Sequence, residues 1–462
     1  MKDVELPIPI KLVYLENKPL IPNEKYEIKL LELIRYNQYG IDSTLMEITN
    51  HILNSTYQTE GIKYPFKEIE TFFNFKEYIN ALSDKIDTVN MYILNKIDNP
   101  FVVDYVRVYQ KEKGIASGKV WRDTDGNVIN AHGGGILFHE GKYYWFGEHR
   151  PAKGFSTEVG VTCYSSTDLC NWRYEGVALS VSEEAGNEIE KGCIMERPKV
   201  IYNKRTKKFV MWFHLELKGK GYEAARAGVA VSDSPTGPYC FVSSSRVCPG
   251  IFPLNMTEEE RDMQWNMEQF EEWWTPEWRE AVNKGLFVKR DLEGGQMSRD
   301  MTLYVDDDGI AYHIYSSEEN LTLQIAELTD DYQGHSGKYV RLFPGGHNEA
   351  PAIFKKDGTY WMITSGCTGW APNAARLFSA PFIWGPWTQH PNPCRGEGSD
   401  KTFGGQSTYV LQLPGNRYLF MADIWRPKSL MYSEYLWIPV RFDEEGMPYL
   451  TLSGKCNPSD GR

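Results

Sequence analysis

Carboxylates and amides precede or begin a set of similar strand-like segments in this sequence. Glu196, Asp300, Glu349 and Gln406 stand at four of these openings, and Asn130 stands at a fifth. A carboxylate in a narrow space is costly unless a function or a cation keeps it there. Two carboxylates held close together raise a carboxyl pKa, so that one of them stays protonated near neutral pH as a general acid. An acid flanked by a second carboxylate is the apparatus of glycoside hydrolysis. The alternative is that each of these residues only bonds neighbouring backbone.

The segments that must position these residues follow one repeated plan. Each contains an apolar strand, a charged or glycine turn, and an aromatic strand. The five copies are GGGILFHEGKYYWFGE, RPKVIYNKRTKKFVMWFH, DMTLYVDDDGIAYHIYSS, APAIFKKDGTYWMITSG and QSTYVLQLPGNRYLFMAD. Five such units predict an all-β fold, a five-bladed β-propeller, which protects its strand edges by radial repetition. A β-sandwich would explain the strands but not the five-fold repeat. In a propeller the first strand of each blade lines the central channel, so the polar openings converge on one axis.

The composition of the chain changes near residue 115. Residues 1–115 are nearly free of glycine and place apolar residues at helical spacing, which predicts an accessory or remnant segment that is mostly helical and ends in a strand. Residues 116–462 are predicted to form the propeller. Residues 249–295 interrupt the repeat with a helix-like, acidic stretch that contains Trp265, Trp273, Trp274 and Trp278. These rings either cover the channel mouth as a sugar-stacking platform or pack the insertion against the propeller, and we favour packing.

Composition argues against several classes of function. The net charge of −12 disfavours nucleic acid as a partner, because phosphate binding needs basic surface. No run of about 18 apolar residues predicts a membrane span, and the first residues show no signal peptide. The eight cysteines form no CxxC pair, which argues against zinc and favours free thiols, with disulfides left open.

From about residue 121 to 450 the chain resembles glycoside hydrolase family 43. The segments RDMTLYVDDDGIAYHIYSS and NEAPAIFKKDGTYWMITSG match the openings of the third and fourth blades in that family. The resemblance implies that Glu349 is the general acid and that Asp300 tunes its pKa and orientation. It also implies an oligosaccharide or polysaccharide substrate. A secreted or periplasmic location would suit the family, and a cytoplasmic one stays open.

Two openings depart from the usual family pattern. Ala131-His132-Gly133 stands where most members keep a general-base aspartate, and Gln406 stands where many keep a metal- or water-holding histidine. The combination of NAHGGG, MERP and GGQS is similar to the exo-β-1,3-galactanase branch, which implies that Gln406 takes the base role, by positioning water or as an imidic acid. Glutamine is a poor base, so Glu196 is the rival candidate.

Further residues are expected to contact the substrate. The resemblance implies that Glu148 and Glu196 bind sugar hydroxyls. Position at the blade openings adds Asn130, His132 and Arg197, and position near the rim adds Trp145 and Trp370 as rings on which a sugar could stack. No second ligand stands at metal spacing from His132, so we expect no metal or cofactor, and the axial calcium of some family members is not favoured here.

The leading hypothesis is an exo-acting, inverting hydrolase that releases galactose from β-1,3-linked galactan of the arabinogalactan type. An α-L-arabinofuranosidase or β-xylosidase fits the wider family, although the missing blade-one aspartate counts against it. The hypothesis from another class is a non-catalytic, carbohydrate-binding propeller. The glycines of NAHGGG lead into a β-hairpin and not into a helix, which argues against a phosphate loop. We expect them to let the backbone approach a sugar.

Overall fold

The computed structural model describes residues 89–94, 105–110 and 115–452, apart from 266 and 271. The chain divides into two compact units, Met1–Lys113 and Gly114–Arg462. In the first unit β1 (Val89–Leu94) pairs antiparallel with β2 (Tyr105–Gln110). Residues 89–94 lie in the segment expected to be mostly helical, and here they form a strand that pairs with the alternating strand that follows them. The other expected helices of residues 1–115 lie outside the described residues.

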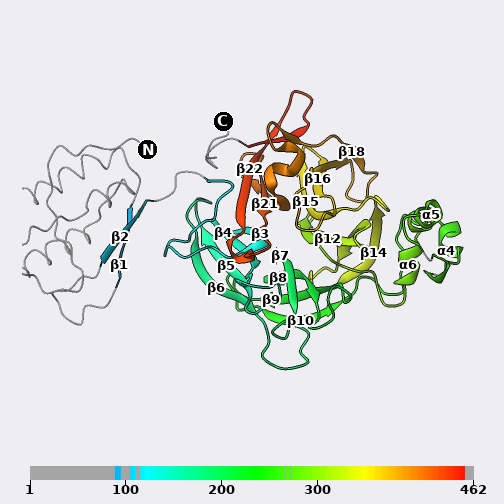
Figure 1. Ribbon diagram of the computed structural model, residues 1–462, viewed down its shortest axis with the longest axis horizontal. Coiled ribbons are helices and arrows are strands. Elements are labelled where there is room, and N and C mark those ends of the chain that lie inside the picture. Colours follow the sequence, from blue (N-terminus) through cyan, green and yellow to red (C-terminus); the bar gives the residue numbers. More distant parts are fainter. Residues whose placement is uncertain (1–88, 95–104, 111–114, 266, 271, 453–462) are drawn as a thin grey trace, which may run out of the picture. The chain divides into compact units, whose positions relative to one another are not determined.

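The second unit is a five-bladed β-propeller, with each blade a separate antiparallel sheet (Figure 1). The first blade contains β3 (His132–His139), β4 (Lys142–Glu148), β5 (Gly160–Ser166) and β6 (Arg173–Ser180). The second contains β7 (Ile194–Asn203), β8 (Lys208–Glu216), β9 (Arg226–Ser232) and β10 (Cys240–Ser245). The third contains β11 (Met301–Val305), β12 (Ala311–Ser317), β13 (Thr322–Leu328) and β14 (His335–Leu342).

The fourth blade contains β15 (Glu349–Lys356), β16 (Thr359–Ser365), β17 (Arg376–Ala380) and β18 (Thr388–His390). The fifth contains β20 (Gln406–Leu413), β21 (Arg417–Ile424), β22 (Glu434–Phe442) and β23 (Pro448–Thr451), and β19 (Cys394–Arg395) adds to β23 in parallel. The residues just before blade one close the ring against this last blade. The amide of Gly118 donates to the carbonyl of Tyr435 at 2.8 Å, and the amide of Trp437 donates to Ser117 Oγ at 3.0 Å.

Four of the five innermost strands carry a register shift close to their first residues. The shifts lie between His132 and Gly135, Glu196 and Lys199, Glu349 and Ala352, and Ser407 and Tyr409. A bulge re-aims the side chains beside it. Gly133, Arg197 and Ala350 accordingly have left-handed backbones, with φ of 60°, 55° and 52°. The predicted polar openings are therefore sites of irregular backbone, where side chains can leave the ordinary alternation of a strand.

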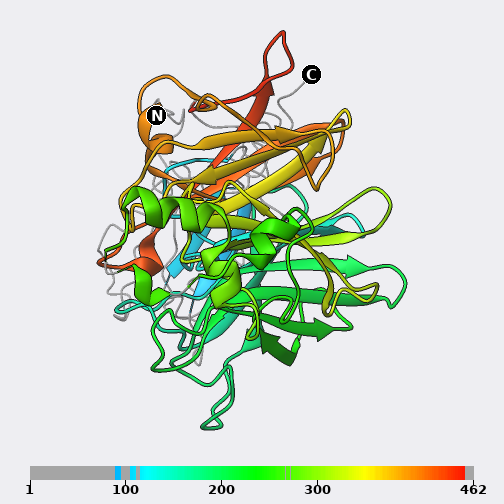
Figure 2. The same ribbon diagram turned by 90° about the vertical axis from the view of Figure 1, so that its right-hand side faces the viewer.

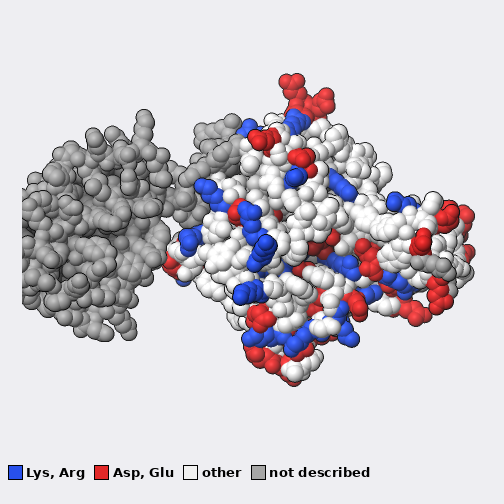
Figure 3. Space-filling view, in the orientation of Figure 1, with Lys and Arg blue, Asp and Glu red and all other residues white. Residues whose placement is uncertain are grey.

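The insertion between blades two and three is helical, as expected. It contains α4 (Glu258–Asp262), the 3-10 turn η1 (Met267–Gln269), α5 (Pro276–Asn283) and α6 (Leu286–Arg290). Its helices lie on the same side of the propeller as the short helical segments η2 (Ser399–Gly404) and η3 (Leu430–Tyr432) (Figure 2). Trp278 is buried in a cluster that contains Phe287 of the insertion and Leu321 of blade three, which agrees with packing for that ring, whereas Trp273 and Trp274 are exposed. Acidic side chains gather over these helices, including Glu258, Glu259 and Glu260 of α4 (Figure 3).

Candidate active site

Glu349 begins β15 at the inner edge of blade four. Its carboxyl group is largely but not fully buried, and its Oε1 accepts a hydrogen bond from Asn320 Nδ2 at 2.8 Å. Burial and the nearby negative charge of Asp300 raise the pKa of Glu349 to about 7. A carboxyl with that pKa is partly protonated at neutral pH, so it can give a proton to a leaving oxygen.

Asp300 lies immediately before β11 and faces the same space. Both of its oxygens pair with the guanidinium of Arg197, at 3.0 Å to Nε and 2.9 Å to Nη2. Its Oδ2 also accepts a hydrogen bond at 3.1 Å from the amide of Ala350, the residue after Glu349. A bidentate pair of this kind fixes orientation as well as charge. Asp300 is thus tied both to the central arginine and to the backbone that carries Glu349.

Gln406 begins β20, and its amide orientation is set by its neighbours. Oε1 accepts from Arg197 Nη2 at 2.7 Å and from Trp425 Nε1 at 2.9 Å, and Nε2 donates to Ser365 Oγ at 3.1 Å. Arg and the Trp indole can only donate, so the carbonyl oxygen must face them. An imidic acid form of Gln406 would point its hydroxyl group at two donors, and this geometry opposes it.

Glu196 and Glu148 share one arginine. Arg150 Nε lies 2.5 Å from Oε2 of Glu148, and Arg150 Nη2 donates to Oε1 of Glu196 at 2.8 Å. The hydroxyl of Tyr222 also donates to Oε1 of Glu196, and Nδ1 of His214 lies 3.2 Å from Oε2. Burial raises the pKa of Glu148. Burial would do the same to Glu196, but Arg150 and His214 outweigh it and hold the pKa of Glu196 well below its usual range.

Two of the three glycines of β3 make room for side chains of the protein itself, and the third, Gly134, lies against the backbone carbonyl of Phe146. A Cβ on Gly133 would lie 2.1 Å from Oε1 of Glu148, and a Cβ on Gly135 would lie 2.6 Å from Cδ of Lys199. Lys199 is fully buried, and its Nζ donates to the carbonyls of Gly133 and Arg197 at 2.8 and 3.3 Å. Burial and the charge of Arg197 lower the pKa of Lys199 to about 7. We expected these glycines to let the backbone approach a sugar. In the structure, Gly133 and Gly135 instead leave the space that the side chains of Glu148 and Lys199 occupy.

Comparison with known proteins places this geometry in a family. The model described as "Glycosyl hydrolases family 43" matches residues 262–426. A solved GH43 β-1,3-galactosidase, determined with galactodeoxynojirimycin, is 73% identical with a TM-score of 0.74, and the match covers 74% of this chain and 100% of that one. The chain belongs to glycosyl hydrolase family 43. As a member of that family it is a glycoside hydrolase, and the expected enzyme class is confirmed.

Two further solved structures resemble this family 43 chain at lower identity. An exo-β-1,3-galactanase from Phanerochaete chrysosporium is 33% identical with a TM-score of 0.58, over 73% of this chain and 66% of that one. An exo-β-1,3-galactanase from Clostridium thermocellum is 35% identical with a TM-score of 0.59, over 73% and 65%. A search of curated protein sequences found no match.

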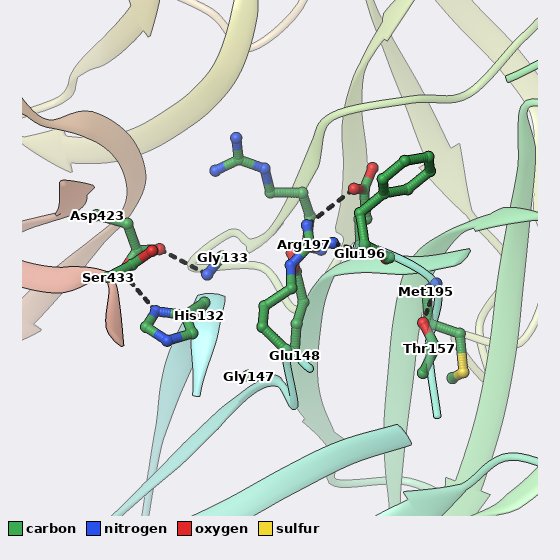
Figure 4. Close-up of polar contacts among 12 residues, drawn as sticks. His132, Gly133, Gly147, Glu148, Thr157, Met195, Glu196, Arg197, Asp423 and Ser433 are labelled. Carbon is green, nitrogen blue, oxygen red and sulfur yellow. Dashed lines mark hydrogen bonds and ion pairs between the residues drawn. The ribbon is translucent and has the colours of Figure 1, made fainter. Parts of the chain in front are cut away.

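Three residues predicted to touch substrate are buried within the family 43 propeller. Both side-chain ends of Asn130 bond the backbone of Arg150, at 2.8 and 2.9 Å. His132 is 0% exposed, stacks on Tyr435 at 5.0 Å, and has its Nδ1 3.6 Å from Asp423. Asp423 also accepts from the amide of Gly133 at 2.6 Å (Figure 4). Substrate contact by Asn130 and His132 is therefore wrong, since both side chains are enclosed and support the opening of β3.

Trp145 is the third such correction. It is 1% exposed and packs edge-on against Trp121, Trp172 and Trp437 in the core between blades one and five. No face of its ring is open to a sugar. The aromatic residues of β4 pack the blade. The aromatic content of the sequence alone could not distinguish such packing from stacking on a sugar.

Trp370 contacts the ring of Trp425, a residue that the sequence analysis did not identify. Trp370 is 45% exposed and lies edge-on to Trp425, with ring centroids 5.7 Å apart. Trp425 in turn donates to Gln406 and lies within 6 Å of the guanidinium carbons of Arg150 and Arg197. The structure thus brings Trp370 beside the polar centre. The guanidinium of Arg197, which was predicted to contact substrate, instead donates to Asp300, Gln406 and the Ser407 carbonyl.

Three features of the described part of the chain concern metals, thiols and membranes. There, no group of three or more His, Cys, Asp or Glu side chains is placed to hold a metal ion. Free thiols in that part include Cys163, Cys193, Cys240, Cys248, Cys367 and Cys394. None of its helices is both long and apolar enough to cross a membrane.

Proposed function

We propose that this family 43 enzyme is exo-acting and releases galactose from β-1,3-linked galactan. The observation that carries the proposal is the Glu349–Asp300 pair, in which a buried acid with a pKa of about 7 faces a second carboxylate. It is set in a chain that is 73% identical to a β-1,3-galactosidase over that protein's whole length. That relative was determined with galactodeoxynojirimycin, an iminosugar with the shape of galactose, which supports a galactosyl site here.

The proposed chemistry proceeds with inversion. Glu349 protonates the oxygen that leaves with the shortened chain, and water attacks the anomeric carbon from the opposite face of the ring. The attacking water loses one proton to solvent, and Glu349 takes one from solvent before the next turnover. The β-linkage is thereby released as α-galactose. Asp300 pairs with Arg197, its negative charge helps to raise the pKa of Glu349, and its Oδ2 accepts from the amide of Ala350 next to the acid. The reaction proposed here uses protein side chains and water.

Gln406 is proposed to position the attacking water. Because Arg197 and Trp425 occupy its carbonyl oxygen, the free group of the amide is the second Nε2 hydrogen, which could hold a water in place. Glu196 is less suited to the base role, because a carboxylate with a strongly lowered pKa is a weak base. Glu196 is instead proposed as an acceptor for a sugar hydroxyl, whereas Glu148 is 2% exposed and its two oxygens are engaged by the Arg197 amide and by Arg150.

Product analysis on de-branched arabinogalactan tests this function. We expect galactose as the first product from β-1,3-galactan, and no arabinose from arabinan or xylose from xylan. Release of arabinose or xylose alone would favour the wider family activities. Carbohydrate binding without release of any monosaccharide would favour a non-catalytic propeller.

A further inference from the structure

Two buried residues behind Glu196 have no part in the mechanism proposed above. His214 and Glu216 are two positions apart in β8, so their side chains lie on the same face of the strand. The register of β7 and β8 places His214 directly opposite Glu196. His214 is 1% exposed and Glu216 is 0% exposed. Charged side chains are rarely buried this deeply unless they are paired.

The imidazole of His214 lies between two carboxylates. Its Nδ1 is 3.2 Å from Oε2 of Glu196, and its Nε2 is 2.8 Å from Oε1 of Glu216. The other oxygen of Glu216 accepts from the amide of Ala225 at 2.9 Å, which fixes that carboxylate from behind. Only the Nε2–Glu216 contact has hydrogen-bond geometry, whereas Nδ1 faces Oε2 of Glu196 at an ion-pair distance. A neutral imidazole that gives its one N–H to Glu216 would turn a bare nitrogen lone pair toward Glu196, whereas the imidazolium places a positively charged N–H there. The geometry therefore favours a doubly protonated His214.

The charges around Arg150 give a reason for this second cation. Arg150 is one positive group shared by the buried carboxylates of Glu148 and Glu196. A buried carboxylate without its own counter-charge tends to bind a proton. His214 supplies that charge on the side of Glu196 away from Arg150. Tyr222, whose ring lies 5.9 Å from the imidazole, donates its hydroxyl to the same Glu196 oxygen as Arg150.

We propose that His214, held as an imidazolium by Glu216, is a positioning residue that keeps Glu196 ionised and fixed as an acceptor for a hydroxyl of the galactosyl unit. Among the described residues, Oε1 of Glu196 is contacted by Arg150 and Tyr222 and Oε2 by His214 alone. Oε2 therefore keeps a lone pair for substrate. This inference rests on the proposed function, since it assigns a role in binding the same sugar.

Two variants should move the pH dependence of KM in opposite ways. Burial alone would lower the pKa of His214, but Glu196 and Glu216 outweigh it and raise that pKa to about 9. His214→Gln removes the cation, so the pKa of Glu196 rises and KM increases as pH falls. Glu216→Gln removes the carboxylate that stabilises the imidazolium, so the pKa of His214 falls. KM then increases as pH rises, and this increase begins at a lower pH than in the native enzyme.

The test is the pH dependence of KM and kcat for galactose release from β-1,3-galactan, measured with the full chain. For His214→Gln we expect KM about tenfold above native at acidic pH, with recovery toward alkaline pH and a smaller change in kcat. His313→Gln is the matched control, because His313 is also buried but contacts His335 and aromatic rings, and pairs with no carboxylate of the described residues. A loss by the same factor at every pH in His214→Gln would overturn the inference.

Two measurements keep the inference separate from the proposed function and from folding. The pH dependence of galactodeoxynojirimycin affinity, measured by calorimetry, tests His214 even if the native enzyme releases no galactose, an outcome that would reject the proposed function alone. The ¹⁵N chemical shifts of the native His214 ring test it even if the variants do not fold. Two protonated ring nitrogens near pH 8 are expected, and a neutral tautomer there would contradict the inference.

Discussion

Asn320 donates a hydrogen bond to Oε1 of Glu349 across 2.8 Å, from the loop after β12 in blade three to the first residue of blade four. Glu318, Glu319 and Asn320 all have left-handed backbones, with φ of 52°, 58° and 62°. Such strain persists only where the surroundings hold it, and Arg341 pairs with both oxygens of Glu318 at 2.7 Å. With Oε1 engaged, the acidic proton of Glu349 is expected on Oε2.

Replacing Asn320 should move the pH profile of catalysis. Loss of its N–H removes a bond that favours ionised Glu349, so the pKa of that acid rises further above its value of about 7. Because the protonated acid is the active form, the alkaline limb of kcat/KM moves to higher pH. We also expect kcat to fall about tenfold, because the carboxyl group loses the hydrogen bond that orients it. Asn320→Gly isolates the amide, since glycine accepts positive φ, whereas Asn320→Ala adds backbone strain. An unchanged alkaline limb in the glycine variant would contradict this role.

Asp300→Asn should shift the same limb in the other direction. Removing the negative charge beside Glu349 removes one cause of its raised pKa, so the alkaline limb of kcat/KM moves to lower pH by about one unit. Weakening of the bidentate pair with Arg197 should also lower kcat by about 10²-fold. Steady-state kinetics across pH measure both effects. A limb that moves to higher pH would show that Asp300 does not act through charge.

Glu349→Gln should separate substrates by their need for acid. On β-1,3-galactan we expect kcat to fall by about 10²–10⁴-fold, because the leaving sugar oxygen must be protonated. An aryl β-galactoside with an acidic phenol as leaving group should lose far less activity in the same variant. Equal losses on both substrates would count against Glu349 as the proton donor.

Gly133→Ala tests the close fit around Glu148. A Cβ there would lie 2.1 Å from Oε1 of Glu148, so the carboxylate must move and kcat/KM should fall by about 10²-fold. Gly141→Ala is the matched control. It also has positive φ, at 80°, but nothing lies within 4 Å of the added atom. It should cost about 1 kcal/mol of stability, measured by denaturant unfolding, with activity retained. Native-like kcat/KM in Gly133→Ala would refute the need for this space.

The repeat in the sequence was sufficient to predict the fold and the polar openings of the blades. Glu349 and Gln406 are the first residues of β15 and β20, and Asp300 directly precedes β11. Each opening stands at a fixed place relative to a hairpin with a recognisable turn, so periodicity locates it. Position in the repeat did not show burial, and so Asn130, His132 and Trp145 were assigned to substrate although protein groups surround them.

The residues that sequence reasoning missed reach the centre from the ends of second strands. Asn320 follows β12, Trp425 follows β21, Arg150 follows β4, and His214 lies near the end of β8. The Trp425–Gln406 and Asn320–Glu349 contacts join residues that are 19 and 29 positions apart in the chain. No local pattern encodes such contacts. In β8, however, the alternation of His214 and Glu216 on one face could have been noticed opposite Glu196.

The most direct test of the central claim is ¹H NMR of galactose at the moment of its release from β-1,3-galactan, before the anomers equilibrate. An exo-acting, inverting enzyme with Glu349 as the acid releases α-galactose first, and the β-anomer appears later by mutarotation. Galactose that appears first as the β-anomer, or cleavage that yields only longer oligosaccharides, would contradict the account.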